Sequence, residues 1–331
     1  MRAYSHTARR RTNPGPAAFH FSAIAYASSM QSGTFLVFLA AMLWATDAPF
    51  RSFLTQGLSS EFIVLGEHFV DFLFVLPILF FSWRSLKNLS FRQWAAVGFI
   101  AIGGSALASI AFTQAFHYVN PSVALLLQKL QPIIAISLAA VFLKETLSPR
   151  FWMYAALALA GAYLISFPSF VPQVYAGEVF NPNTMGVVLA LSAALLWAAS
   201  TVLGRYMLGS VDFKLLTALR FSIAFGFLLA LNAAQGGLSA VSQLSGTDVL
   251  YLVIIACVSG VASLFIYYRG LSTTPASVAT LAELGYPVAA VFINWLFIPG
   301  SALVPMQVVG VAILLGAMWG LGKGDVRDAT H

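Results

Sequence analysis

Residues 40–45 read AAMLWA and residues 193–198 read AALLWA, so five of the six positions are identical at an offset of 153 residues. A second block recurs at nearly the same offset, because six of 14 positions match between residues 122–135 and 277–290. Each block contains a less common residue, tryptophan in the first and proline in the second. Two such blocks at nearly one offset favour a duplicated chain over chance similarity between apolar segments.

Both blocks lie within long apolar runs, and the whole composition is typical of a membrane protein. The 331 residues are 60% hydrophobic and only 8% charged, with a mean hydropathy of +0.86. A soluble domain has about 25% charged residues, because its surface faces water. About 20 apolar residues in a helix cross a hydrocarbon core of about 30 Å. We therefore expect transmembrane helices near residues 33–54, 61–82, 93–116, 122–143, 151–168, 184–208, 214–232, 248–268, 275–298 and 305–321.

Ten helices in a duplicated chain give five to each repeat, an odd number, so the second repeat enters the membrane from the opposite side. The predicted fold class is therefore all-α, a polytopic membrane protein with ten transmembrane helices in two inverted five-helix repeats. The repeats comprise residues 33–168 and 184–321, joined by an outer connecting loop at residues 169–183. In transporters built this way, the substrate site lies near the bilayer midplane between the repeats, and alternating access exchanges their conformations.

The basic residues predict the orientation. With the N-terminus in the cytoplasm, 14 of the 17 Lys and Arg residues fall on the inner side, as expected from the positive-inside rule. The outer stretches 169–183, 233–247 and 299–304 contain none, and Arg51 alone lies near the outer face. We expect both termini, including the tail at residues 322–331, to be cytoplasmic. The expected location of the protein is a bacterial inner membrane. The net charge of +6 does not indicate nucleic-acid binding, because the basic residues separate apolar runs instead of covering one face.

Residues 1–32 are expected to form a disordered basic extension. They contain Arg9, Arg10 and Arg11 followed by a weakly apolar stretch, and Met30 is a candidate functional start. The alternative is a signal peptide cleaved after Ala27. Cleavage would place the start of the next helix outside, against the charge bias.

Ionisable residues inside the helices are the main candidates for a functional site. Each costs about 2.5–3.5 kcal/mol at a helix centre, so each should face a cavity or a partner. In the middle and outer half of the membrane these are Asp47, Glu67, His68, Asp71 and Lys129, and in the inner half they are Arg220 and Glu283. The repeat alignment sets Glu67 against Arg220. It also sets Gln128 against Glu283.

These groups have two open interpretations. In the first they bind a zwitterionic substrate or carry a proton, since Glu67 and Asp71 are spaced i, i+4 and two close carboxylates in low dielectric are rarely both ionised. In the second they are fixed ion pairs that hold the helices in register. His68 is either a proton relay or a hydrogen-bonded interior residue. No metal site is expected, because no second His or Cys joins this group. The expected ion pairs are Lys129 with Glu67, Asp71 or Asp47, and Arg220 with Glu283.

Aromatic and amide side chains supply further candidates for the lining of a cavity. Trp44 and Trp197 occupy matching mid-helix positions and are expected to face each other across the pseudo-two-fold axis. Tyr267, Tyr268 and Gln114 are additional lining candidates. The alternative for all five is a role in packing.

Prolines inside the expected spans mark candidate hinges. Each removes a backbone hydrogen bond and bends its helix. Pro132 and Pro287 are equivalent in the two repeats, so we expect them to act as paired hinges for gating, together with Pro49.

The run at residues 115–124 (AFHYVNPSVA), continuing through Pro132 to FLKETL at residues 142–147, resembles the signature of EamA-type carriers of the drug/metabolite transporter superfamily. The resemblance covers about residues 33–320. The second half departs from it, with Pro299-Gly300 where the first half has Lys144-Glu145. This resemblance implies a ten-helix fold with a central cavity and secondary transport of amino acids, other metabolites or amphipathic compounds, often outward.

The predicted function is that of a secondary active transporter, exporting amino acids or related small amphiphilic metabolites by alternating access, with protons as the candidate coupling ion. Its expected partners are a small-molecule substrate and the lipid bilayer, with no cofactor, and either a monomer or a homodimer fits the sequence. The alternatives are an uptake permease or facilitator and, more remotely, a channel or an intramembrane enzyme. No nucleophile–base pair or phosphate-binding glycine loop is present in the sequence, so we do not expect an enzyme or an ATP site.

Overall fold

The structure is a computed structural model that describes residues 16–115, 117–119, 121–170, 184–297, 303–321 and 326–327. These residues are almost entirely helical. The first half contains α1 (Pro16–Trp44), η1 (Ala45–Asp47), α2 (Ala48–Leu54), α3 (Ser60–Leu86), α4 (Phe91–Phe99), η2 (Ile100–Leu107), α5 (Ala108–Ala115), α6 (Pro121–Gln128), α7 (Gln131–Leu138), η3 (Ala139–Leu143), strand β1 (Thr146–Leu147) and α8 (Pro149–Ser166). The second half contains α10 (Thr184–Leu208), α11 (Phe213–Ala234), η4 (Gly237–Gln243), α12 (Gly246–Ile255), η5 (Ala256–Ala262), α13 (Ser263–Leu271), α14 (Ala276–Ala282), α15 (Gly285–Phe297), α16 (Pro305–Leu321) and strand β2 (Val326–Arg327).

Among the described residues, eight helices are long and apolar enough to cross a membrane. An apolar chain in lipid satisfies its backbone hydrogen bonds within a helix, because no water is available to do so. The two other apolar segments expected from the sequence form α8, with 18 residues, and α16, with 17.

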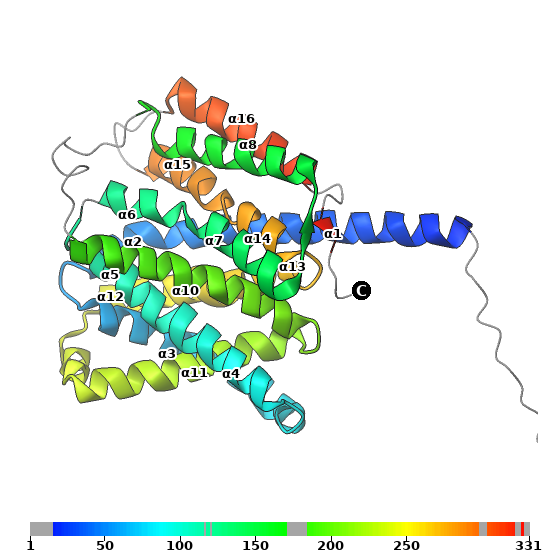
Figure 1. The fold of residues 1–331 in the computed structure, drawn as a ribbon. Helices are drawn as coiled ribbons and strands as arrows, with labels where there is room; N and C mark the ends of the chain where they lie inside the picture. The colour runs from blue at the N-terminus through cyan, green and yellow to red at the C-terminus, as the bar shows by residue number, and fades with distance from the viewer. Residues whose placement is uncertain are drawn as a thin grey trace, which may run out of the picture.

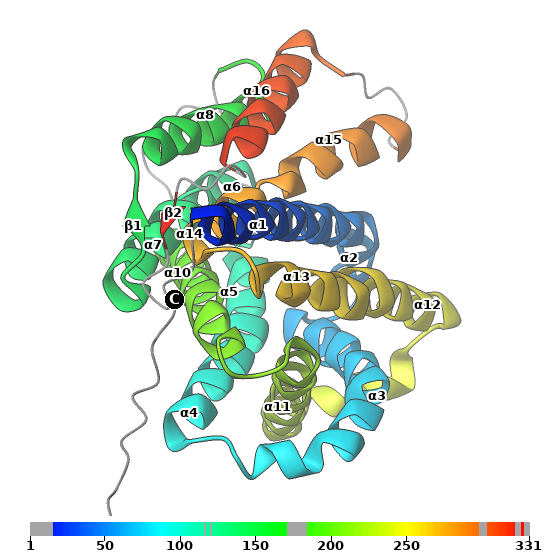
Figure 2. The ribbon, with the colours of Figure 1, turned by 90° about the vertical axis from the view of Figure 1, so that its right-hand side faces the viewer.

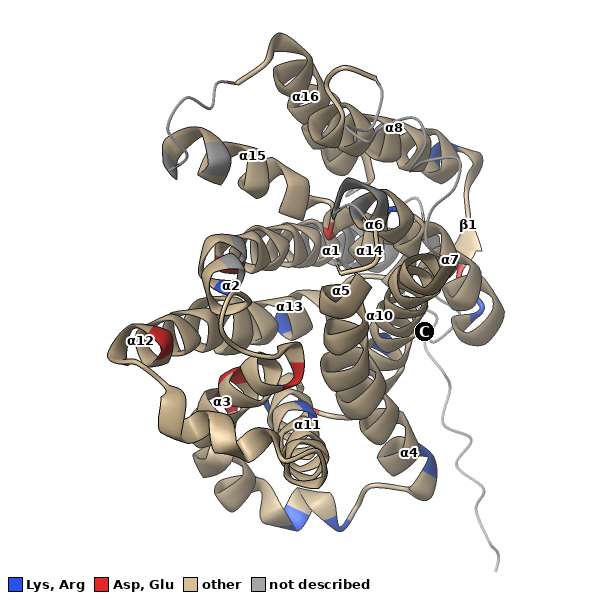
Figure 3. Cartoon of the chain, turned by 90° about the vertical axis from the view of Figure 1, so that its left-hand side faces the viewer, with Lys and Arg blue, Asp and Glu red and all other residues tan. Residues whose placement is uncertain are grey.

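The helices lie side by side, with their connections gathered at the two ends of the bundle (Figure 1). The end-on view places α8 and α16 at one edge and α3, α4 and α11 at the other, with α1, α10 and α13 between them (Figure 2). Charged residues occupy few positions along the helices (Figure 3). Many large apolar side chains are exposed on the outside of the bundle, among them Phe80, Phe81 and Trp319.

Contacts between the two halves come in matching sets. α1 packs against α13 and α15, while α10, its equivalent in the second half, packs against α5 and α7. The equivalent helices α3 and α11 pack against each other, as do α8 and α16. Each contact is thus repeated when the halves are exchanged, which accords with the duplication seen in the sequence.

Three of the membrane helices are interrupted just before a proline. The breaks lie at residues 45–47, 129–130 and 283–284, and Pro49, Pro132 and Pro287 fall in the first turn of the helical segment that follows each break. A proline is tolerated there because the first-turn N–H groups have no partner within the helix. The prolines therefore lie beside the breaks rather than bending continuous helices, and their role as hinges remains a prediction.

Three π-helical segments occur in the described residues, and two of them, η2 and η5, occupy equivalent positions in the middle of the helices that span Phe91–Ala115 and Gly246–Leu271. Each of these two carries a glycine where another helix comes close. A Cβ atom on Gly104 would collide with the Ser200 hydroxyl, and a Cβ atom on Gly260 would collide with the Asp71 carboxyl group. These π segments were not predicted from the sequence, because hydropathy is the same for a π-turn and an α-turn.

The pair α8 and α16 is held together through glycines. A Cβ atom added to Gly161 would lie 2.8 Å from the Gly310 carbonyl oxygen, and one added to Gly310 would lie 2.8 Å from the Gly161 carbonyl oxygen. Small residues of this kind let the backbones of membrane helices approach closely. The two backbones are therefore in direct contact, with no room for a side chain at either position.

The connection between η3 and α8 joins the two halves at one end of the bundle. Its strand β1 pairs antiparallel with β2, near the C-terminus. The buried Glu145 side chain accepts hydrogen bonds from the backbone N–H groups of Ala276 (2.7 Å) and Ser277 (3.1 Å), and from the Ser277 hydroxyl (2.5 Å). Glu145 of the first half thus caps the N-terminus of α14 in the second half.

The first helix begins earlier than expected. We expected disorder through residue 32, but α1 is continuous from Pro16. Residues 17–32 contain no glycine or proline and five alanines, a composition that favours helix. Residues 1–15, most of the expected outer loop at 169–183 and most of the tail at 322–331 lie outside the described residues.

Candidate functional site

A cavity of about 600 Å³ lies between the two halves. Eleven of the thirteen residues proposed from the sequence to form the site line it, as do Pro132 and Pro287. The eleven are Trp44, Asp47, Glu67, His68, Asp71, Gln128, Lys129, Trp197, Arg220, Tyr267 and Glu283. The structure therefore brings these side chains together, while the transport roles assigned to them remain predictions.

Two proposed lining residues and one proline lie outside the cavity wall. The Gln114 amide donates to Glu61 Oε1 at 3.3 Å, near the end of α5. Tyr268 is fully buried behind the wall, where its hydroxyl accepts a hydrogen bond from Arg220 and its ring packs against Tyr267. Pro49 is exposed at the start of α2 and does not line the cavity.

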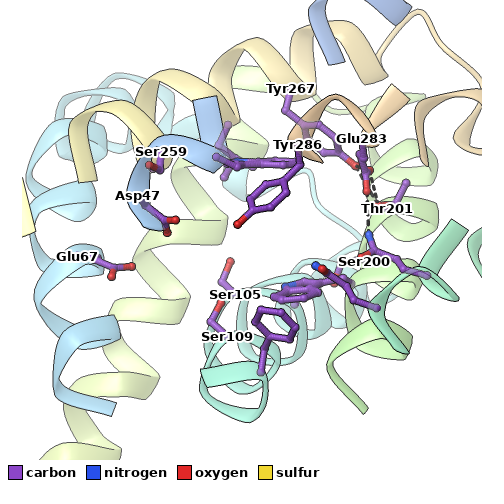
Figure 4. Close-up of a pocket in the computed structure, with 18 of the residues that line it drawn as sticks. Asp47, Glu67, Ser105, Ser109, Ser200, Thr201, Ser259, Tyr267, Glu283 and Tyr286 are labelled. Carbon is purple, nitrogen blue, oxygen red and sulfur yellow. Dashed lines mark hydrogen bonds between the residues drawn. The ribbon is translucent and has the colours of Figure 1, made fainter. Parts of the chain in front are cut away.

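Aromatic rings form much of the apolar wall. Trp44 packs against Tyr267 with ring centroids 5.1 Å apart, and Trp197 packs against Phe112 at 5.2 Å. Tyr286 also lines the cavity and points into it (Figure 4). Aromatic faces from both halves are therefore available to a flat ligand.

Glu283 lies at the break between α14 and α15. Its carboxylate accepts hydrogen bonds from the Tyr267 hydroxyl (2.8 Å), the Thr201 hydroxyl (3.1 Å) and the Gln131 amide (2.8 Å). Figure 4 shows Glu283 with Thr201 and Tyr267 on one side of the cavity, and Asp47 and Glu67 on the other. Donors from three other helices thus hold the Glu283 carboxylate in the cavity wall.

The expected pair of Arg220 with Glu283 is not formed. Arg220 instead donates from Nε to the Ser105 hydroxyl at 2.6 Å and from a terminal nitrogen to the Tyr268 hydroxyl at 2.9 Å. Its guanidinium also lies over the Tyr268 ring, 5.7 Å from the centroid. This prediction was wrong because similar depth in the membrane does not fix which way two helices face each other.

The predicted ion pair of Lys129 with Glu67, Asp71 or Asp47 was also wrong. Arg51 takes that place, lying 2.8 Å from both Asp47 Oδ2 and Glu67 Oε1. Within the described residues, Lys129 forms no ion pair, although it lines the cavity. The sequence did contain a signal for Arg51, since Asp47 and Arg51 are spaced i, i+4.

Several hydroxyl groups in the cavity were not predicted. They come from η2, α5, α10, η5, α14 and the end of α2, and Figure 4 labels Ser105, Ser109, Ser200, Thr201 and Ser259 among them. Serine and threonine are common in membrane helices, where they bond to their own helix backbone, so their presence in the sequence gave no signal. The serine and threonine residues that line the cavity are Thr55, Ser105, Ser109, Thr113, Ser200, Thr201, Ser259 and Thr280.

Removing the Arg51 charge is expected to destabilise the protein, because Asp47 and Glu67 would lose their counter-charge. The Arg51 and Asp47 side chains are 22% and 18% exposed. The loss should therefore stay below the roughly 3–5 kcal/mol typical of a buried pair that loses one partner. We expect Arg51→Met to lower Tm in detergent, and added Glu67→Gln to restore part of it. Arg84→Met, at the exposed end of α3, is the control; an Arg51→Met protein as stable as this control would contradict the interpretation.

Comparison with known proteins identifies the family. The EamA-like transporter family matches residues 31–167 and again residues 184–322. The chain is 30% identical over 289 residues to the riboflavin transporter ImpX of Fusobacterium nucleatum, covering 86% of this chain and 95% of that protein. It is 29% identical over 277 residues to an uncharacterized transporter of Archaeoglobus fulgidus, covering 80% and 89% of the two chains.

A protein of known crystal structure has the same fold. It superposes with a TM-score of 0.69 at 17% sequence identity, covering 87% of this chain and 96% of the other. The double family match confirms both the duplication and the resemblance noted in the sequence. Together with the eight apolar helices, these findings show that the chain is a multi-pass integral membrane protein of the EamA-like transporter family.

Proposed function

We propose that this protein is a secondary transporter of a flat, amphiphilic aromatic metabolite of the riboflavin class. The observation that carries the proposal is the cavity between the halves, in which aromatic walls adjoin a set of hydroxyl and amide groups. Riboflavin combines a three-ring aromatic system with a polyhydroxylated chain, so both kinds of wall would have a partner. The volume of about 600 Å³ lies within the range of about 300–1,000 Å³ usual for small-molecule sites.

The relative named as a riboflavin transporter supports this substrate class, because it aligns over nearly its whole length. The proposed mechanism is alternating access between two inverted five-helix repeats, with ten spans and both termini in the cytoplasm. The matching contacts of α1 and α10 with the opposite half support the inverted arrangement. The mutual packing of α8 and α16 alongside the longer helices supports the count of ten.

Export of amino acids is the second candidate, and one observation favours it. Lys129 and Glu283 carry opposite charges in the same cavity, and neither has an ion-pair partner within the described residues. A zwitterion could neutralise both, with its carboxylate at Lys129 and its ammonium group at Glu283. In either case we propose that the proton gradient supplies the energy, with uptake or facilitated exchange as the alternatives to export.

Counterflow in proteoliposomes tests the proposed substrate class. Vesicles loaded with unlabelled riboflavin should accumulate labelled riboflavin transiently and saturably, whereas vesicles loaded with individual amino acids should not accumulate the corresponding label. Saturable amino-acid exchange without riboflavin exchange would support the second candidate instead. A time course in each direction, with and without a pH gradient, distinguishes export, uptake and facilitated exchange.

Trp197→Ala is expected to raise the half-saturating riboflavin concentration about 2- to 10-fold, corresponding to an aromatic contact of about 0.5–1.5 kcal/mol. Trp295→Ala is the matched control, because Trp295 is exposed on α15 and does not line the cavity. Equal affinities in the two variants would show that the Trp197 ring does not contact the substrate.

A further inference from the structure

Asp71 differs from the other carboxylates of the cavity because, within the described residues, it has neither an ion-pair partner nor a side-chain hydrogen bond. Asp47 and Glu67 share Arg51, and Glu283 accepts three hydrogen bonds. Asp71 is 1% exposed, and within the described residues it forms no ion pair. Its Oδ1 atom is buried without a hydrogen-bond partner.

An ionised carboxylate in these surroundings would be strongly unfavourable. Removing a charge from water costs several kcal/mol even after relaxation, unless a partner and hydrogen bonds compensate for it. A neutral carboxyl group avoids that cost, because its desolvation penalty is much smaller. The Asp71 carboxyl group is therefore expected to carry a proton in this conformation.

The backbone around Asp71 is shaped to admit the carboxyl group. Asp71 lies in α3, which packs along the π segment η5. A side chain at Gly260 would collide with the carboxyl oxygens. The absence of a side chain at Gly260 therefore leaves the space that the Asp71 carboxyl group occupies.

The titratable and charged neighbours of Asp71 include a candidate proton carrier, His68, and a positively charged residue, Arg220. Glu67 and His68 precede Asp71 on α3 itself. The titratable group on η5 is Cys257, and the charged group on the facing helix α11 is Arg220. His68 lines the cavity, and its Nδ1 atom lies 2.9 Å from the Val64 carbonyl oxygen; its Nε2 atom has no hydrogen-bond partner among the residues that the structure describes. Its imidazole can thus relay a proton between water in the cavity and Asp71, one turn away.

Arg220 is the cation that would approach Asp71 in a second conformation of the protein. In the present conformation its guanidinium is bound to Ser105 and Tyr268. A rearrangement of α11 against α3 that brings Arg220 to Asp71 would stabilise the ionised carboxylate and release its proton to water. The carboxyl group gains a proton in one state and loses it in the other, so each cycle carries one proton with no other reactant.

We infer that Asp71 is the proton-binding residue that couples transport to the proton gradient, with His68 as its relay to the cavity. This inference rests on the proposed function as a transporter but not on the identity of the substrate. Glu67 is unsuited to the role because Arg51 holds it in an ion pair. Glu283, held by three donors in the cavity wall, is assigned to substrate binding.

The test separates exchange from coupling, because counterflow needs no net proton movement. Asp71→Asn should retain riboflavin counterflow within about threefold of wild type, since the replacement conserves volume. It should lose accumulation against a gradient driven by a pH difference, together with substrate-dependent proton flux measured with a dye inside the vesicles. Asp212→Asn is the control, because Asp212 caps α11 at the surface and Asn is an equally good cap.

Two results would overturn the inference. One is proton-driven accumulation by Asp71→Asn at the wild-type level; the other is a folded Asp71→Asn protein without counterflow, which would make Asp71 a substrate ligand. Wild-type protein with no saturable exchange of any substrate in the panel would instead reject the proposed function, and this outcome is distinct from both.

A measurement on the wild-type protein covers the case in which Asp71→Asn does not fold. Dicyclohexylcarbodiimide reacts with protonated carboxyl groups in apolar surroundings, and the modified peptide is identified by mass spectrometry. Asp71 should be the principal site, with labelling that falls as the pH is raised. Labelling at Glu67 or Glu283 with none at Asp71 would reject the assignment.

Discussion

Glu145→Ala is expected to lower the free energy of unfolding by about 3–5 kcal/mol, because a buried carboxylate that accepts hydrogen bonds from Ala276 and Ser277 would be lost. The two backbone N–H groups belong to the first turn of α14, where a negative charge also interacts favourably with the helix dipole. The measurement is Tm in detergent, followed by size-exclusion chromatography.

Glu61→Ala is a suitable control, because Glu61 lies in the first turn of α3 at the bundle end and is only partly buried. Equal Tm values for the two variants would contradict the capping role of Glu145. The contact has no acidic counterpart in the second half, where Pro299-Gly300 stands at the equivalent position. The loss should therefore loosen the end of the bundle that contains β1 more than the opposite end.

Gly310→Val is expected to lower the stability of the folded protein by the largest amount after Glu145→Ala. An added Cβ atom would lie 2.8 Å from the Gly161 carbonyl oxygen and 2.9 Å from the Ile165 backbone nitrogen. Neither backbone atom can move aside as a flexible side chain can. The cost should therefore reach the upper end of the roughly 1–3 kcal/mol typical of overpacking, or exceed it.

Gly316→Val in the same helix is the matched control, because nothing lies within 4 Å of a Cβ atom at that position. We expect Gly310→Val to reduce Tm and the yield of folded protein, and Gly316→Val to leave both near the wild-type values. No residue of α8 or α16 lines the described cavity, so the Gly310→Val protein that does fold should keep its substrate affinity. A large fall in affinity at unchanged Tm would indicate that this helix pair takes part in binding.

The apolar runs were sufficient to predict where most helices lie. Their lengths and flanking residues locate α3, α10 and α11 closely, since lipid requires a continuous helix over each run. Hydropathy could not predict the π segments or the breaks before Pro132 and Pro287, because it measures polarity and not the hydrogen-bond pattern. It also could not detect the helical start at Pro16, where the composition is only weakly apolar.

The sequence predicted which charged residues lie at the site, because a charged side chain inside a membrane helix is costly unless it faces a cavity or a partner. Each ionisable residue placed inside a helix lies at the cavity, as expected when lipid exposure is unfavourable. The pairing was not predictable, because depth along a helix gives no information about the direction of a side chain around it. Arg51 was missed for a related reason, since it was counted as a basic residue near the outer face rather than as the partner of Asp47.

The segments η2 and η5 also determine how the site would respond to a change in helix length. A π-turn contains one residue more than an α-turn. Deleting one residue from η2 would therefore let that helix become regular, and Phe112 and Thr113, which lie beyond η2 and line the cavity, would keep their direction. The same deletion near the start of the regular helix α10 would turn everything beyond it by about 100° around the helix axis, and Trp197 would then face away from the cavity although no cavity residue had been replaced.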